Sequence, residues 1–211
     1  MKERPILFSA PMVRAILEGK KTQTRRIIKP QPPNEAHPFF IMCSSHKKDE
    51  GKWRFTANKD HLSGTVLGPI ACPYGKPGDL LWVREAWAVQ HEYDAFAPSE
   101  IGSSARWHYA ATEYLGDLRK RPSILLPRRG SRITLEITDV RVERLQQISE
   151  DDAIAEGVTP TMPIYGDCGG FEHQGGRDAF WRLWESIHGT DSWNANPWVW
   201  VIEFRRMEVR Q

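Results

Sequence analysis

Alternating and short apolar runs predict a protein built mainly of strands. The strongest run, 198–204, carries large apolar side chains on one face and Val199 and Val201 on the other. Because both faces are apolar at its start, this strand is expected in the middle of a sheet. The run 130–142 alternates clearly but changes parity around Thr138–Asp139, which indicates a β-bulge. Further strands are predicted over residues 5–8, 22–27 and 80–83.

Helical spacing marks three short segments, each followed by a glycine. Apolar residues share one face in 11–17, and in 180–187 they fall at i, i+3, i+4 and i+7. A shorter helix is predicted after Ser149–Asp152, which has the form of a capping box, and Glu156 is expected as its last residue. The predicted stops are Gly19, Gly189 and Gly157.

The segments between these elements are rich in proline, glycine and polar residues. They are interpreted as insertions at about 29–70, which could hold a hairpin, 90–128 and 159–176. Strands interrupted by two or three short helices fit a single α+β domain over residues 1–211, built on a mixed or antiparallel sheet. The number of strands suits a small β-barrel.

Composition places the chain among ordinary globular proteins. It has 211 residues, 40% of them hydrophobic and 27% charged, and its apolar runs are shorter than the roughly 18 residues that a membrane span needs. A cytoplasmic protein without membrane contact or an obligate protein partner is expected. Its three cysteines include no C-x-x-C pair, which predicts neither a disulfide framework nor a metal, and no cofactor is expected.

The chemistry concentrates in a basic turn, Gly19 to Arg26. If residues 22–27 form a strand, Thr22, Thr24 and Arg26 point to one side, and Gln23 and Arg25 point to the other. The net charge of +2 is only mildly basic, but the clustered cations could hold phosphates. The four cations of the turn are Lys20, Lys21, Arg25 and Arg26.

The spacing Gly19-x-Lys21-Thr22-x-Thr24-x-Arg26 resembles the signature turn of the ASCH domain family. That resemblance implies a PUA-like fold, a small β-barrel of mixed or antiparallel strands with short flanking helices. The strands at 133–138 and 199–204 are similar to the central and closing strands of the family. The chain is most similar to a larger type common in phages and prophages, in the runs Cys72–Asp79, Trp82–Glu85 and Ser131–Thr134.

One ASCH branch that the turn resembles is the bacterial N4-acetylcytidine amidohydrolases. The resemblance implies a catalytic site of Lys21, Thr24 and Glu156, with a modified nucleoside such as N4-acetylcytidine as substrate. Amide hydrolysis needs a nucleophile, a base and an acid for the leaving amine. Thr24 would attack, Lys21 would act as the base if burial or its cationic neighbours lower its pKa, and Glu156 would protonate the departing nitrogen. Arg26 would hold an oxyanion or a phosphate.

Other residues are candidates for binding nucleobases or RNA. Arg84 and Glu85 lie at a strand end, where they could contact a base edge or form a salt bridge. Trp87 follows directly and could stack on a base, as could Trp53 and Trp107 in the insertions, whereas most of the nine tryptophans are expected in the core. A metal site could form only if the fold happened to bring together Cys72, Cys168 and His173.

Three functions therefore remain open from the sequence. The first is an amidohydrolase that deacylates a modified nucleoside at the Lys21, Thr24 and Glu156 site. The second is a non-catalytic module that grips single-stranded RNA through Lys20, Arg25 and the rest of the basic turn. The third is a metal-assisted ribonuclease, which the lack of an acidic or histidine cluster disfavours.

Overall fold

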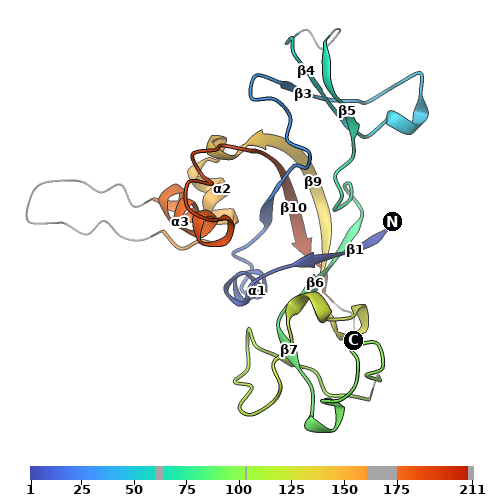
Figure 1. The fold of residues 1–211 in the computed structure, drawn as a ribbon, viewed down its shortest axis with the longest axis vertical. Helices are drawn as coiled ribbons and strands as arrows, with labels where there is room; N and C mark the ends of the chain where they lie inside the picture. Colours follow the sequence, from blue (N-terminus) through green and yellow to red (C-terminus); the bar gives the residue numbers. More distant parts are fainter. Residues whose placement is uncertain (60–63, 103, 161–174, 209–211) are drawn as a thin grey trace, which may run out of the picture.

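The computed structural model describes residues 1–59, 64–102, 104–160 and 175–208. Its centre is a five-stranded mixed sheet in the order β1-β6-β9-β10-β2, in which β1 and β6 are parallel and the other neighbours are antiparallel (Figure 1). The chain is thus an α+β protein with a mixed sheet, as expected from its pattern. The five strands are β1 (Glu3–Leu7), β2 (Gln23–Ile27), β6 (Leu80–Arg84), β9 (Thr134–Arg144) and β10 (Trp198–Arg206).

The pairing of the described strands leaves the central sheet open rather than closed into a barrel. Its edge strands, β1 and β2, are joined in the chain by α1 (Ala10–Leu17) and share no strand ladder in the described residues. One side chain crosses the opening, because Nη2 of Arg26 on β2 donates a hydrogen bond to the carbonyl oxygen of Leu7 on β1 at 2.7 Å. Arg26 therefore links the two edges.

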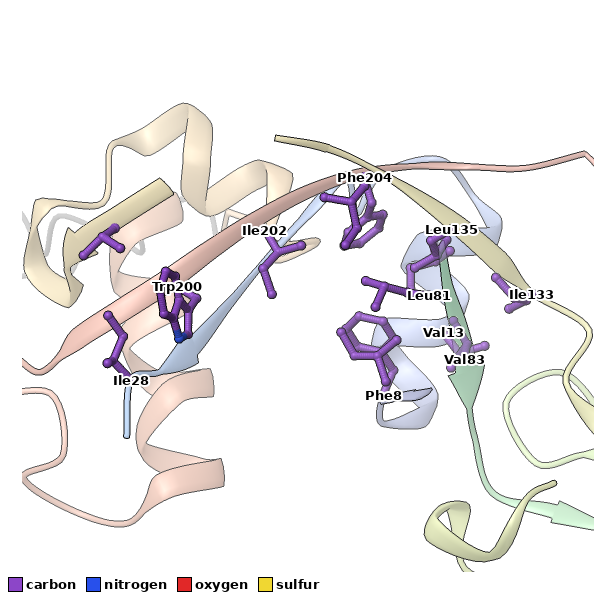
Figure 2. Close-up of a cluster of buried hydrophobic side chains, with 14 of the residues drawn as sticks. Phe8, Val13, Ile28, Leu81, Val83, Ile133, Leu135, Trp200, Ile202 and Phe204 are labelled. Carbon is purple, nitrogen blue, oxygen red and sulfur yellow. The ribbon is translucent and has the colours of Figure 1, made fainter. Parts of the chain in front are cut away.

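The central strand β10 has two buried faces, as its sequence predicts. Trp200, Ile202 and Phe204 enter the main core with side chains of β1, α1, β6 and β9 (Figure 2). Val199 and Val201 pack on the opposite face against α2 (Glu150–Ala155) and α3 (Gly176–His188). β10 lies between β9 and β2 because apolar partners cover both of its faces.

The predicted bulge lies in β9. Ile137 pairs with Phe204, and Asp139 pairs with Glu203, so Thr138 is the extra residue between two consecutive partners. This insertion explains why the alternation of apolar residues changes parity at that point.

The first two predicted insertions form separate structures at opposite ends of the molecule (Figure 1). The first contains a three-stranded antiparallel sheet, and the second, with the residues beside it, holds a small apolar cluster around a two-stranded sheet. The third lies mostly outside the described residues, together with Cys168 and His173. The strands here are β3 (His37–Phe40), β4 (Trp53–Thr56), β5 (Thr65–Ile70), β7 (Trp87–Ala88) and β8 (His108–Tyr109). Short 3₁₀ helices span Lys47–Asp49, His91–Tyr93, Ser123–Leu125, Arg128–Gly130 and Leu145–Gln147.

The described helices are short or amphipathic. Among the residues that the structure covers, no helix has both the length and the apolar character needed to cross a membrane.

Candidate functional site

The basic turn is shaped by the end of α1. Gly19 has a φ of 73°, a conformation that glycine adopts without strain, and it reverses the chain directly after the helix. The amide nitrogens of Lys20 and Lys21 then donate to the carbonyl oxygen of Ala15 at 2.8 and 3.0 Å. The amide of Thr22 continues to the carbonyl oxygen of Ala155, the last residue of α2, at 2.8 Å. The turn is therefore bound to both helices.

Helix α2 brings Glu156 to this turn. Ser149 caps the helix as predicted, because its Oγ accepts a hydrogen bond from the amide of Asp152 at 3.1 Å. Glu156 follows the last helical residue and forms an isolated β-bridge with Lys21. Gly157 ends the segment with a φ of 85°. A Cβ at Gly157 would stand 2.9 Å from the Cβ of Lys21, so the close approach of the two segments requires glycine.

Lys21 and Glu156 form a buried ion pair. The Nζ of Lys21 lies 2.7 Å from Oε2 of Glu156 and 2.7 Å from its backbone oxygen. The side chains are 0% and 3% exposed. The ring of Phe8 covers the pair from the core side, with its centroid 5.7 Å from Nζ. An ion pair sealed in this way is held by its hydrogen bonds, because water cannot replace them.

Arg25 supplies the second cation on Glu156. Its Nη1 lies 3.3 Å from Oε1 of Glu156, while its Nη2 binds Glu143 at 3.0 Å and Asp152 at 2.9 Å. Gln23 also binds Asp152, so the side chains of Gln23 and Arg25 lie on one face of β2, as the alternation predicts. The Glu156 carboxylate is thus fixed between two cations and oriented by a wider charged network.

Burial and three neighbouring charged side chains together set the pKa of Lys21. Burial lowers the pKa of its ammonium group, the contact with Glu156 raises it, and the positive charges of Arg26 and Arg25 lower it further. The net result is a pKa below the ordinary value. This is the direction that a lysine needs in order to act as a base.

A small cavity lies beside the ion pair. It measures about 30 Å³, which is the space of one water molecule. Thr24, Arg25, Arg26 and Glu156 line it, so the structure brings the predicted threonine and glutamate to the same cavity, whereas Lys21 is not among the described lining residues. Helix α3 closes the other side, with Phe180, Leu183, Trp184, Ile187 and His188.

Several hydrogen-bond donors around this cavity have no acceptor among the described residues. The buried Nε of Arg26, Nε of Arg25 and Nε1 of Trp184 all lack a partner. Buried N–H groups are rarely left unpaired, and three such groups on one cavity are what a bound carbonyl, carboxylate or phosphate oxygen would satisfy. The sequence had placed Trp184 in the core only. Its helical apolar stripe gives no sign that the same ring borders a site.

The remaining predicted binding residues lie apart from this cavity. Lys20 is exposed and pairs with Glu18 at 2.7 Å. Glu85 is buried and forms a bidentate ion pair with Arg132 at 2.9 and 3.0 Å. Of the two roles predicted for Glu85, contact with a base edge or a salt bridge, the structure therefore has the salt bridge. Arg84 packs over the ring of Trp82 at 4.6 Å.

The three tryptophans predicted as candidates for base stacking differ in how deeply they are buried. Trp87 is 0% exposed, packed between Trp107 and Arg121, so its ring presents no face to a ligand and belongs to the core. Trp107 packs in the same cluster, and Trp53 is half-buried at the other end of the molecule.

Neither metal ligands nor known relatives add to this description. The described residues hold no group of three or more histidine, cysteine or acidic side chains placed to bind a metal ion. Comparisons with protein-family models, with curated proteins and with solved structures found no match. The site must therefore be interpreted from its own geometry.

Proposed function

We propose that this chain is an ASCH-type, PUA-like protein that hydrolyses the N-acyl amide of a modified nucleobase such as N4-acetylcytidine. The observation that supports the proposal is the buried pair of Lys21 and Glu156, together with the small cavity that Glu156 and Thr24 both line. The proposed nucleophile and the carboxylate border one cavity, and the proposed base, whose pKa is lowered, is hydrogen-bonded to that carboxylate.

The proposed reaction proceeds through an acyl-threonine. A proton first moves from the Lys21 ammonium to the Glu156 carboxylate along their 2.7 Å hydrogen bond. Oγ of Thr24 then attacks the acyl carbonyl while the neutral amine of Lys21 accepts the hydroxyl proton, and Glu156 passes its proton to the leaving nitrogen as the C–N bond breaks. Water then hydrolyses the ester, releases the carboxylic acid and restores Thr24. The Nε of Arg26, which has no acceptor among the described residues, is suited to the carbonyl oxygen as it becomes negative.

The size of the cavity limits which part of the substrate can enter it. About 30 Å³ does not admit a nucleobase, because ligand pockets usually measure about 300–1,000 Å³. The side chains of Ile187 and His188 border the cavity on α3 and are exposed, and the ring of His188 packs on Trp184 with centroids 4.1 Å apart. In this proposal the acyl group enters the cavity, and the base lies over its mouth against α3.

The test is acetate release from N4-acetylcytidine without added metal. Thr24→Ala and Lys21→Met should each lower kcat/KM by at least about 100-fold, in the range expected for a nucleophile or a general base. Thr22→Ala and Lys20→Met are matched controls, since both residues are exposed neighbours in the same turn, and they should keep the wild-type rate. Equal turnover by all four variants, or no acetate from the wild type, would refute the proposal.

A further inference from the structure

A second and much larger cleft lies away from the buried pair. It measures about 800 Å³, within the usual range of ligand pockets. Its walls come from the end of β3, the start of β4, the turn before β6, and strands β1 and β9. The cleft therefore exists only because the first insertion stands beside the central sheet.

One wall of the cleft is aromatic. Phe40 and Trp53 face each other across the β3–β4 pair, with ring centroids 5.2 Å apart and planes tilted by 53°. Phe40 is 41% exposed, and Trp53 is half-buried against the main core. A partly open aromatic pair on a rigid sheet is a suitable surface for stacking a planar base.

Other lining residues of the cleft carry positive charge. Lys2 and Lys76 are exposed lining residues, and neither forms an ion pair within the described part of the chain. Arg4 also lines the cleft, but Asp79 neutralises it at 2.9 Å. Cys72 also lines the cleft, and burial raises the pKa of its thiol to about 11, so the thiol is uncharged at neutral pH. Lys52 and Arg141 line the cleft as well, but Lys52 pairs with Asp49 and Arg141 pairs with Glu143. Among the described lining side chains, Lys2 and Lys76 are thus the cationic ones without an ion pair.

The charge pattern limits what the cleft can bind. The carboxylates of Glu50 and Asp139 also line it, so its wall is not a uniform surface for polyanions. A ligand that combines a planar apolar face with one or two phosphates matches both the aromatic pair and the lysines. Short single-stranded nucleic acid has this chemistry, whereas a duplex hides the faces of its bases.

We propose that this cleft binds single-stranded nucleic acid, with a base stacked on Phe40 and Trp53 and adjacent phosphates on Lys2 and Lys76. The site is separate from the cavity at Thr24 and does not depend on the proposed hydrolase activity. Two lysine contacts predict a weak dependence on salt, with a slope of log K against log salt of about −1.4.

The experiment is fluorescence anisotropy of the full chain with labelled oligouridine and oligothymidine of about eight nucleotides. Phe40→Ala should weaken binding by about 5- to 150-fold, the range for loss of one stacked base. Lys76→Ala should weaken it and reduce the magnitude of the salt slope by about 0.7. Trp181→Ala and Lys48→Ala, an exposed aromatic residue and an exposed lysine outside the cleft, are the matched controls.

Further variants and competitors distinguish specific binding in the cleft from other binding. Trp53→Leu, checked by thermal unfolding, gives a second test of the aromatic wall. Tighter binding of the RNA or of the DNA probe identifies the source, and loss of binding in the cleft variants alone supports the site. The proposal fails if neither probe binds at about 100 µM protein, the range of weak non-specific binding. It also fails if duplex RNA or polyglutamate competes equally well, or if Thr24→Ala abolishes binding while Phe40→Ala does not.

Discussion

Lys21 and Glu156 are 135 positions apart in the chain, yet the ammonium group of Lys21 donates to both the carboxylate and the backbone oxygen of Glu156 at 2.7 Å. The pair connects the turn after α1 to the end of α2. Because both side chains are sealed from solvent, the pair affects folding as well as any chemistry at the site.

Removing Lys21 alone should destabilise the protein strongly. Lys21→Met leaves the buried Glu156 carboxylate with only the longer contact to Arg25, and we expect a loss of about 3 kcal/mol in the free energy of unfolding. Urea denaturation followed by circular dichroism measures this loss. Lys20→Met, on the exposed neighbour, should change stability by less than about 0.5 kcal/mol.

A double variant separates the lost ion pair from a packing defect. Lys21→Met with Glu156→Leu removes both charges, so it should recover part of the stability that Lys21→Met loses. If the double variant is less stable than Lys21→Met, the unpaired charge of Glu156 is not the cause of the stability that Lys21→Met loses.

The pKa of Lys21 should lie below the ordinary lysine value of about 10.4, because burial outweighs the attraction of Glu156. Glu156→Gln removes a charge that raises this pKa, so the pKa should fall further. NMR titration of ¹³C-labelled lysine, with the signal assigned by its loss in Lys21→Met, measures both values. An unchanged or higher pKa in Glu156→Gln would contradict the described pairing.

Asp152 should make stability depend on pH in the acid range. Burial raises the pKa of its carboxyl, but the charges of Arg25 and Arg141 and the hydrogen bonds from Gln23 and Arg25 outweigh burial, so the net pKa is lowered. A lowered carboxyl pKa adds stability above the unfolded value of about 3.9 and loses it as pH falls through the folded value.

The matching experiment compares unfolding at several pH values. Asp152→Asn should cost about 1 kcal/mol at pH 7, and the difference from wild type should shrink as the pH falls below about 3.9 and through the lowered pKa of Asp152. Asp151→Asn, on an exposed neighbour in the same helix turn, should stay within about 0.5 kcal/mol. A cost for Asp152→Asn that does not change with pH would indicate a packing effect instead.

Gly157 should tolerate no side chain. Gly157→Ala places a Cβ 2.9 Å from those of Ala15 and Lys21, in addition to the strain of its positive φ. We expect a loss of about 3 kcal/mol and reduced activity. Gly19→Ala is the control, because Gly19 has a similar φ but no atom within 4 Å of the added Cβ, and it should cost only about 1 kcal/mol. Equal costs would show that contact with Lys21 is unimportant.

Local patterns in the sequence predicted most strands of the central sheet. The two apolar faces of β10 (Trp198–Arg206) predicted its central position, and the change of parity in β9 (Thr134–Arg144) predicted the bulge at Thr138. Gly19 and Gly157 were predicted as stops, and both have a positive φ. These features follow from neighbours along the chain, so a single sequence can specify them.

The sequence predicted only some of the residues of the site. Alternation along β2 predicted that Thr24 and Arg25 lie on opposite faces of the strand. Glu156 was indicated by a family resemblance and not by a pattern in the sequence. The pattern along α3 indicated a core helix and missed Trp184 as a wall of the cavity. Likewise, the segment around Trp87 has no reliable period, so the sequence could not show that its ring is fully buried.

The sequence by itself determined the strands of the central sheet and the three helices to within a few residues at their ends, and which of their side chains share a face. Only the tertiary structure decided that Lys21 meets Glu156, that Glu85 meets Arg132, and that α3 reduces the cavity to about 30 Å³. The physical reason is that periodicity encodes the buried face of one element. The partner that covers this face depends on how elements distant in the chain dock together.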